Sequence, residues 1–137
     1  MMTKDGPLLS VLLAVGTGAA LGAMARWALS YALNAKLATL PLGTLSANLL
    51  GGWLIGITLA WTAAHPGLPP AVRLFIVTGF LGGLTTFSTF SAESVGLILK
   101  GMVGPALLHA GLHLGGSLLA CFAGVKTGQW IRAVLGG

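Results

Sequence analysis

The sequence predicts an all-α membrane protein with four transmembrane helices, the third of which is broken. The chain is 55% hydrophobic and only 7% charged, with a mean hydropathy of +0.95, whereas soluble domains carry about 25% charged residues. Four apolar runs each reach the roughly 20 residues that a spanning helix needs. The third run contains three glycines within five residues. We therefore expect one transmembrane domain over residues 1–137, with no soluble domain.

Charge excludes several function classes. The net charge of +5 comes from seven basic and two acidic residues that are scattered along the chain, which is typical of membrane anchors and not of a nucleic-acid patch. We expect no nucleic-acid partner and no enzyme activity. The single cysteine, Cys121, rules out an intramolecular disulfide, and its role stays open.

The first predicted span covers residues 8–33, a run too long for a signal peptide and without a convincing cleavage site. Ala14, Gly18, Gly22 and Arg26 form a row at i, i+4 spacing. Small residues at this spacing let a neighbouring helix approach closely. Arg26 is interpreted either as an anchor that reaches the membrane interface or as a cation in an aqueous vestibule that attracts anions.

The second predicted span covers residues 43–63 and repeats this spacing with Thr44, Asn48, Gly52 and Gly56. An amide within the bilayer must find hydrogen-bond partners. Asn48 therefore either bonds to a neighbouring helix or, together with Thr44, offers N–H and O–H donors to a passing anion.

The third predicted span, residues 71–99, contains Gly79, Gly82 and Gly83. Glycine costs about 1 kcal/mol relative to alanine inside a helix, so we expect a break, centred on residues 82–85. Backbone groups freed within a bilayer must face protein, a polar pathway or an ion. This stretch is therefore a candidate ion site.

Aromatic and hydroxyl side chains follow the glycines. Phe87 and Phe90 share one helix face and alternate with hydroxyl residues, which argues against a plain lipid-facing surface; these are Thr86, Ser88, Thr89 and Ser91. Glu93 is the only acidic residue after Asp5. An intramembrane carboxylate indicates function, unless Glu93 lies near the water interface and is merely solvated.

The fourth predicted span covers residues 103–125 and is followed by a polar tail with Lys126 and Arg132. His109, His113, Ser117 and Cys121 form another i, i+4 row. Two histidines four residues apart can hold a transition metal, but no acidic or further cysteine ligand is evident nearby. We expect these polar groups to face the interior or the mouth of the bundle.

Two of these stretches together resemble the Fluc/CrcB fluoride channels. The stretches are Gly43-Thr44-Leu45-x-x-Asn48 and Gly79-Phe80-x-Gly82-Gly83-x-Thr85-Thr86-Phe87-Ser88-Thr89-Phe90-Ser91-x-Glu93. Arg26 near the end of the first span fits the family as well. The resemblance covers all four spans, and the motif in the third span is highly specific.

The resemblance implies a fluoride-selective channel in the bacterial inner membrane that exports fluoride passively from the cytoplasm and so reduces its toxicity. It implies a dual-topology homodimer of two antiparallel subunits in the lipid bilayer, with two pores. The pore residues would be Asn48, Phe87, Phe90, Thr44, Ser88 and Thr89. It further implies a structural sodium ion at the dimer centre, held by the backbone carbonyls of Gly82 and Thr85. His109 stands where the family often has a pore-lining tyrosine.

Two other functions stay open. A small dual-topology multidrug exporter would need a carboxylate in the first span, and this span has none. A membrane assembly protein without transport activity would explain the glycine rows, but not the phenylalanines and hydroxyl residues of the third span.

Overall fold

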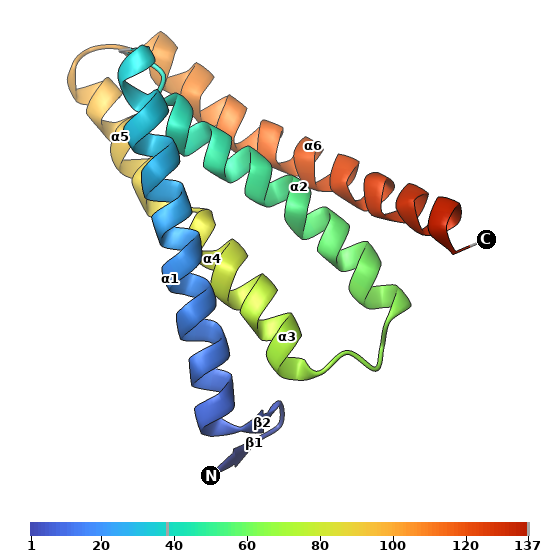
Figure 1. The fold of residues 1–137 in the computed structure, drawn as a ribbon. Helices are drawn as coiled ribbons and strands as arrows, with labels where there is room; N and C mark the ends of the chain where they lie inside the picture. Colours follow the sequence, from blue (N-terminus) through green and yellow to red (C-terminus); the bar gives the residue numbers. More distant parts are fainter. Residues whose placement is uncertain (38, 137) are drawn as a thin grey trace.

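The computed structural model describes residues 1–37 and 39–136, and these residues are mostly helical (Figure 1). The first two spans are α1 (Leu8–Leu33), followed by the short 3-10 helix η1 (Asn34–Lys36), and α2 (Leu42–Ala64). The third span consists of four consecutive pieces: α3 (Pro70–Leu74), the π-helix η2 (Phe75–Leu81), α4 (Gly82–Leu84) and α5 (Phe87–Leu99). The last helix is α6 (Val103–Leu135).

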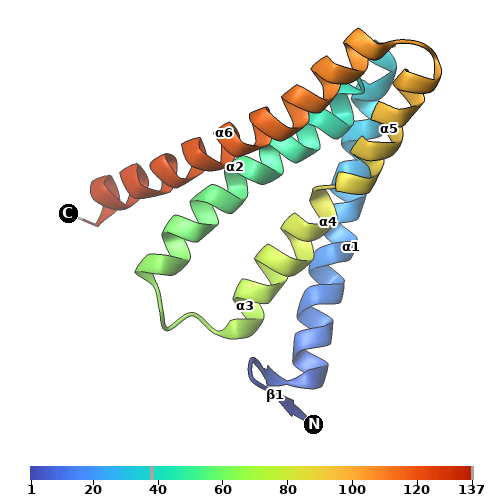
Figure 2. The same cartoon turned by 180° about the vertical axis from the view of Figure 1, so that it is seen from behind.

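The helices form two diverging limbs. α1 packs on η2 and α4, while α2 packs along α6. Figures 1 and 2 show that the limbs meet near α5 and separate toward the end that carries both termini and the connection from α2 to α3. A groove lies between the third span and the pair formed by α2 and α6.

In the part of the chain that the structure describes, four helices are long and apolar enough to cross a membrane, which confirms the four predicted spans. The fourth helix is longer than predicted, because it ends at residue 135 and not at 125. Its polar end stays helical. The ammonium of Lys126 lies 5.5 Å from the centre of the Phe122 ring, one turn earlier, which is within cation–π range. The chain also begins with a small unpredicted hairpin of β1 (Met2–Thr3) and β2 (Gly6–Pro7).

The predicted rows of small residues are confirmed as helix contacts. Gly18 and Gly22 of α1 are buried, and a Cβ on either would meet backbone atoms of η2 or α4. On the other limb, a Cβ on Gly52 would lie 2.9 Å from the Ser117 carbonyl oxygen, and one on Gly56 would meet the backbone of α6. Each limb is therefore held by backbones that approach closely at glycine.

The glycines of the third span differ from the prediction. Gly82 keeps helical torsions (φ −64°, ψ −37°), and the extended residues are Thr85 (ψ 154°) and Thr86 (φ −152°, ψ 122°). Gly79 and Gly83 instead pack against the backbone of α1. The glycine cluster thus serves close helix packing, and the backbone leaves helical geometry two residues after it.

Gly56→Ala is expected to destabilise the protein by about 1–3 kcal/mol, because the added methyl group overpacks the contact with α6. The matched control is Gly115→Ala on α6, where a Cβ meets nothing within 4 Å and alanine gains helix propensity. Thermal unfolding in detergent measures both variants. Equal melting temperatures would contradict this description of the α2–α6 contact.

Candidate functional site

A groove of about 400 Å³ lies between the two limbs. Its walls come from α2, η2, α4, α5 and α6, together with the two extended threonines. The polar residues on it are Asn48, Thr85, Thr86, His113 and Ser117, and the phenylalanines are Phe87 and Phe90. Most of the remaining lining is aliphatic or glycine, so these few polar groups determine what the groove can bind.

Asn48 connects α2 to the extended residues of the third span. The Thr86 N–H donates to Asn48 Oδ1 (2.7 Å), and Asn48 Nδ2 donates to the Thr86 carbonyl (2.9 Å). The amide thus pairs with both backbone groups of a residue that has left the helix, as burial of polar backbone requires. Its second N–H points to His113 Nδ1, 2.9 Å away. Asn48 therefore holds the extended backbone in place with two of its hydrogen bonds. Its remaining N–H donates to His113 and could donate to another acceptor instead.

Thr86 is also the N-cap of α5. Its Oγ1 accepts a hydrogen bond from the Thr89 N–H (3.1 Å) and lies 3.4 Å from Ser88 Oγ. A hydroxyl at this position satisfies one of the orphan N–H groups of a helix start. Ser88 and Thr89 therefore gather with Thr86 at the first turn of α5, although neither lines the groove itself.

Phe87 and Phe90 lie edge to face, with ring centres 5.3 Å apart. Phe87 is 77% exposed, whereas Phe90 stacks on both histidines of α6, at 4.8 Å from His113 and 5.5 Å from His109. Ring edges carry partial positive charge. The exposed ring of Phe87 is thus free to present its edge to an anion or to a partner subunit.

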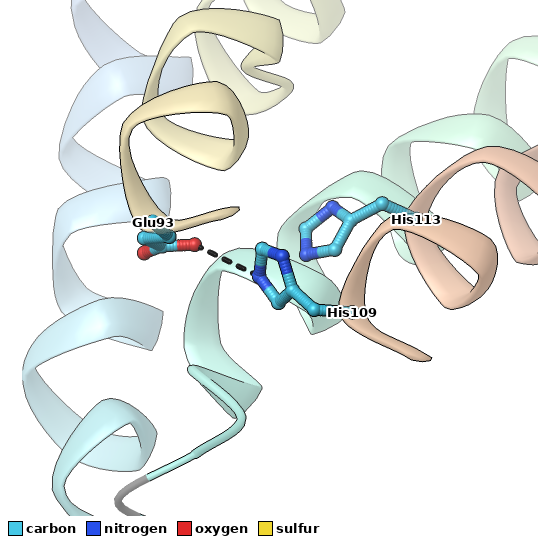
Figure 3. Close-up of side chains that lie close together, drawn as sticks. All are labelled: Glu93, His109 and His113. Carbon is cyan, nitrogen blue, oxygen red and sulfur yellow. Dashed lines mark ion pairs between the residues drawn. The ribbon is translucent and has the colours of Figure 1, made fainter. Parts of the chain in front are cut away.

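Glu93, His109 and His113 lie together between α5 and α6 (Figure 3). Glu93 Oε2 is 3.3 Å from His109 Nε2, and its other oxygen accepts a hydrogen bond from the buried Thr44 hydroxyl (2.7 Å). The expectation that no acidic residue lies near the histidines was wrong. The alternative that Glu93 is merely solvated at the interface was also wrong, because Oε2 is buried.

Comparison with known proteins identifies the family. The profile of the CrcB-like protein family, described as camphor resistance (CrcB), matches residues 13–125. A relative from Cupriavidus pinatubonensis is 57% identical over 122 residues, which are 89% of this chain and 95% of the relative. One from Thiobacillus denitrificans is 53% identical over 124 residues, which are 90% of this chain and 100% of the relative. The chain belongs to the CrcB-like family. Both relatives are named fluoride-specific ion channel FluC.

The carbonyls of residues 82 and 85 in this CrcB-like chain lack their usual helical partners. In a continuous helix the N–H groups of residues 86 and 89 would donate to them, but these N–H groups donate to Asn48 Oδ1 and Thr86 Oγ1 instead. The Gly83 carbonyl accepts from Arg26 Nε at 3.1 Å. Arg26 thus reaches across to the third span and does not point only toward the interface.

The structure brings some predicted site residues together and separates others. Asn48, Phe87, Phe90, Gly82 and Thr85 line the groove, whereas Thr44 is fully buried and bonded to Glu93. His109 is fully buried beneath Phe90 and does not line the groove. His113 and Ser117 line it instead. The i, i+4 row of α6 indicated these two residues, but spacing alone does not say which members of a row reach a groove.

Proposed function

We propose that this chain is a fluoride-selective channel and not an enzyme. Two things support the proposal: the family relatives bear the name of fluoride-specific channels, and the groove carries the donors that a small anion needs. Fluoride is tightly hydrated, so a pore must replace its water with N–H, O–H or ring-edge donors. The single observation that carries the proposal is the hydrogen bonding of Asn48. This residue lines the groove, and its second N–H donates only to His113.

In this proposal fluoride takes the place of His113 as the acceptor of that N–H. The two bonds between Asn48 and the Thr86 backbone can then stay intact while the anion binds, so the local structure does not have to open. No lysine or arginine lines the groove among the described residues. This suits conduction, since a fixed cation would hold the anion too strongly to release it.

We further propose that two antiparallel copies form the working unit. The groove lies between the limbs, which diverge toward one end of the molecule (Figures 1 and 2), and one four-helix chain is too small to enclose a pore of its own. A second copy against this groove would cover the exposed Phe87 and the apolar lining. Fluoride would then pass between the subunits.

A structural sodium ion fits the residues at the proposed dimer centre. Sodium is a hard cation that prefers oxygen ligands, and the carbonyls of Gly82 and Thr85 have lost their helical donors to Asn48 and Thr86. Two subunits would supply these oxygens twice about a two-fold axis. The ion would offset the converging carbonyl dipoles and add positive charge near the pores.

The test is a fluoride efflux measurement on purified protein in liposomes, with a fluoride electrode and a matched chloride measurement. We expect passive fluoride flux and no chloride flux, because rigid short-range donors favour the smaller anion. Similar rates for both ions would contradict the selectivity, and rates equal to those of protein-free liposomes would contradict the channel. A multidrug exporter or an assembly protein predicts no fluoride flux at all.

A further inference from the structure

The cluster of Glu93, His109 and His113 contains three buried atoms without a hydrogen-bond partner among the described residues: Glu93 Oε2, His109 Nε2 and His113 Nε2. His109 is 0% exposed and His113 is 4% exposed. Leaving one buried polar atom unsatisfied costs about 1–3 kcal/mol. Glu93 Oε2 and His109 Nε2 lie 3.3 Å apart and partly satisfy each other as an ion pair, so His113 Nε2 is the atom that most needs a further partner. The cluster is therefore a candidate for a bound ligand.

Each of the three side chains is anchored from outside the cluster. Ser94 Oγ lies 2.9 Å from His109 Nδ1, Asn48 Nδ2 lies 2.9 Å from His113 Nδ1, and the Thr44 hydroxyl donates to Glu93 Oε1. Figure 3 shows the His109 ring between Glu93 and the His113 ring. Metal ligands are oriented by outer hydrogen bonds of this kind. The bonds of Glu93 and His109 are compatible with a bound metal, whereas His113 accepts from Asn48 and would have to give up this bond to become a ligand.

The donor set and the spacing fit a transition-metal dication. Two imidazole nitrogens and one carboxylate oxygen are typical ligands of Zn²⁺ and its neighbours. One potential ligand atom from each residue lies within 4.8 Å of the others. The 3.3 Å between Glu93 Oε2 and His109 Nε2 already matches the edge of a tetrahedron with bonds of about 2.0–2.1 Å. To join them, the His113 ligand atom would have to move from within 4.8 Å of the other two atoms to about 3.3 Å from each.

We propose that Glu93, His109 and His113 form a binding site for a divalent transition metal of the Zn²⁺ class, and that the bound metal slows anion flux. The effect on flux rests on the proposed function, whereas metal binding does not. The three ligands would leave a fourth position open for water or an anion. A dication beside the groove would hold an anion more strongly and delay its exit.

His113 couples the metal to Asn48. The orientation of the Asn48 amide is set by its two bonds to Thr86, so Nδ2 is the donor and His113 Nδ1 the acceptor. Neutral His113 therefore carries its proton on Nε2. When a metal takes Nε2, that proton must move to Nδ1, where it faces the Asn48 N–H. The bond between Asn48 and His113 is then lost, so occupancy of the site changes the groove.

Binding is tested on EDTA-treated protein in detergent, by calorimetry with Zn²⁺ and by the visible spectrum of added Co²⁺. We expect about one Zn²⁺ per chain and the intense Co²⁺ bands of a tetrahedral site. Glu93→Gln and His109→Gln should abolish both signals, and Ser94→Ala should weaken Zn²⁺ binding by about 10–100-fold, as loss of an outer hydrogen bond does. The matched control is His65→Gln, since His65 is exposed and outside the cluster.

Size-exclusion chromatography checks that each variant is folded, and His113→Gln replaces any variant that is not. Absence of Zn²⁺ binding to the wild-type protein, or binding that survives the cluster substitutions, overturns the site and leaves a buried water or a shared proton as its content.

Flux is then measured in liposomes with and without Zn²⁺. We expect inhibition in the wild type and in His65→Gln, but none in His109→Gln. Zn²⁺ binding without inhibition overturns the regulatory effect, whereas absence of flux in metal-free protein overturns the proposed function and leaves the binding result intact.

Discussion

Asn48→Asp is expected to lower fluoride efflux from liposomes by about a thousandfold. A carboxylate at this position places a negative charge about 4 Å from the proposed fluoride path, which costs roughly 4 kcal/mol at an effective dielectric constant of 20, and each 1.4 kcal/mol is about a tenfold change. The substitution also removes the N–H donors that now reach the Thr86 carbonyl and His113. Electrostatics and donor loss therefore act in the same direction.

The matched control for Asn48→Asp is Asn34→Asp. Asn34 Oδ1 accepts from the N–H groups of Gly43 (2.7 Å) and Thr44 (3.2 Å) at the start of α2. A carboxylate there keeps both bonds and suits the helix N-terminus, and it loses only the long 3.4 Å bond from Asn34 Nδ2 to Thr44 Oγ1. We expect this variant to retain its fold and its flux, although it carries the same added charge. Normal flux through Asn48→Asp, with normal size-exclusion behaviour, would show that the anion path lies elsewhere.

The four spans and the rows of small residues could be predicted because they depend on local properties of the chain. Length and apolar composition define a spanning helix, and i, i+4 spacing defines one helix face. Gly18, Gly22 and Gly56 were therefore recognised as contact residues before their partner helices were known. The predicted fourth span ended at residue 125, before the charged residues, whereas the helix itself continues to residue 135, because charged residues limit the membrane-embedded part of a helix and not the helix.

The glycines of the third span show that tertiary contacts can outweigh local helix propensity. Low helix propensity predicted that the backbone would leave the helix at these glycines, yet Gly79 and Gly83 are used to pack on α1. The extended torsions occur at Thr85 and Thr86, where the Asn48 amide replaces the helical hydrogen bond of the Thr86 N–H. That replacement depends on a side chain from another helix, which propensity does not describe.

The Glu93–His109 pair was missed although the sequence contained a signal for it. Both residues lie eight positions from Gly101, which has a positive φ of 74° in the tight connection between α5 and α6. Residues at equal distances from the turn of an antiparallel helix hairpin lie at the same level. Treating the two helices as one hairpin would have placed the carboxylate beside the histidine.

The chain is expected to insert in both orientations, since its charge bias is small. The helices alternate in direction, so the termini and the α2–α3 connection share one end, and the other two connections share the opposite end. Four basic residues lie toward the first end (Lys4, Arg73, Lys126 and Arg132) and three toward the second (Arg26, Lys36 and Lys100). Orientation follows the excess of Lys and Arg on the cytoplasmic side, and a difference of one residue fixes neither orientation. Reporters at the C-terminus, one active only in the cytoplasm and one only outside it, should therefore both give signal.

Charge variants can force each orientation in turn. Replacing Lys36 and Lys100 with glutamine leaves most of the basic residues at the end that carries the termini. Replacing Lys4, Lys126 and Arg132 with glutamine leaves most of them at the other end. Each variant expressed alone should give one reporter signal and almost no fluoride flux, because two parallel copies cannot form the proposed antiparallel unit. Co-expression of the two variants should restore flux, since each supplies the orientation that the other lacks. Full flux from either variant alone would contradict the antiparallel dimer, and the same loss in the co-expressed pair would show that the substitutions damage the fold and not the pairing.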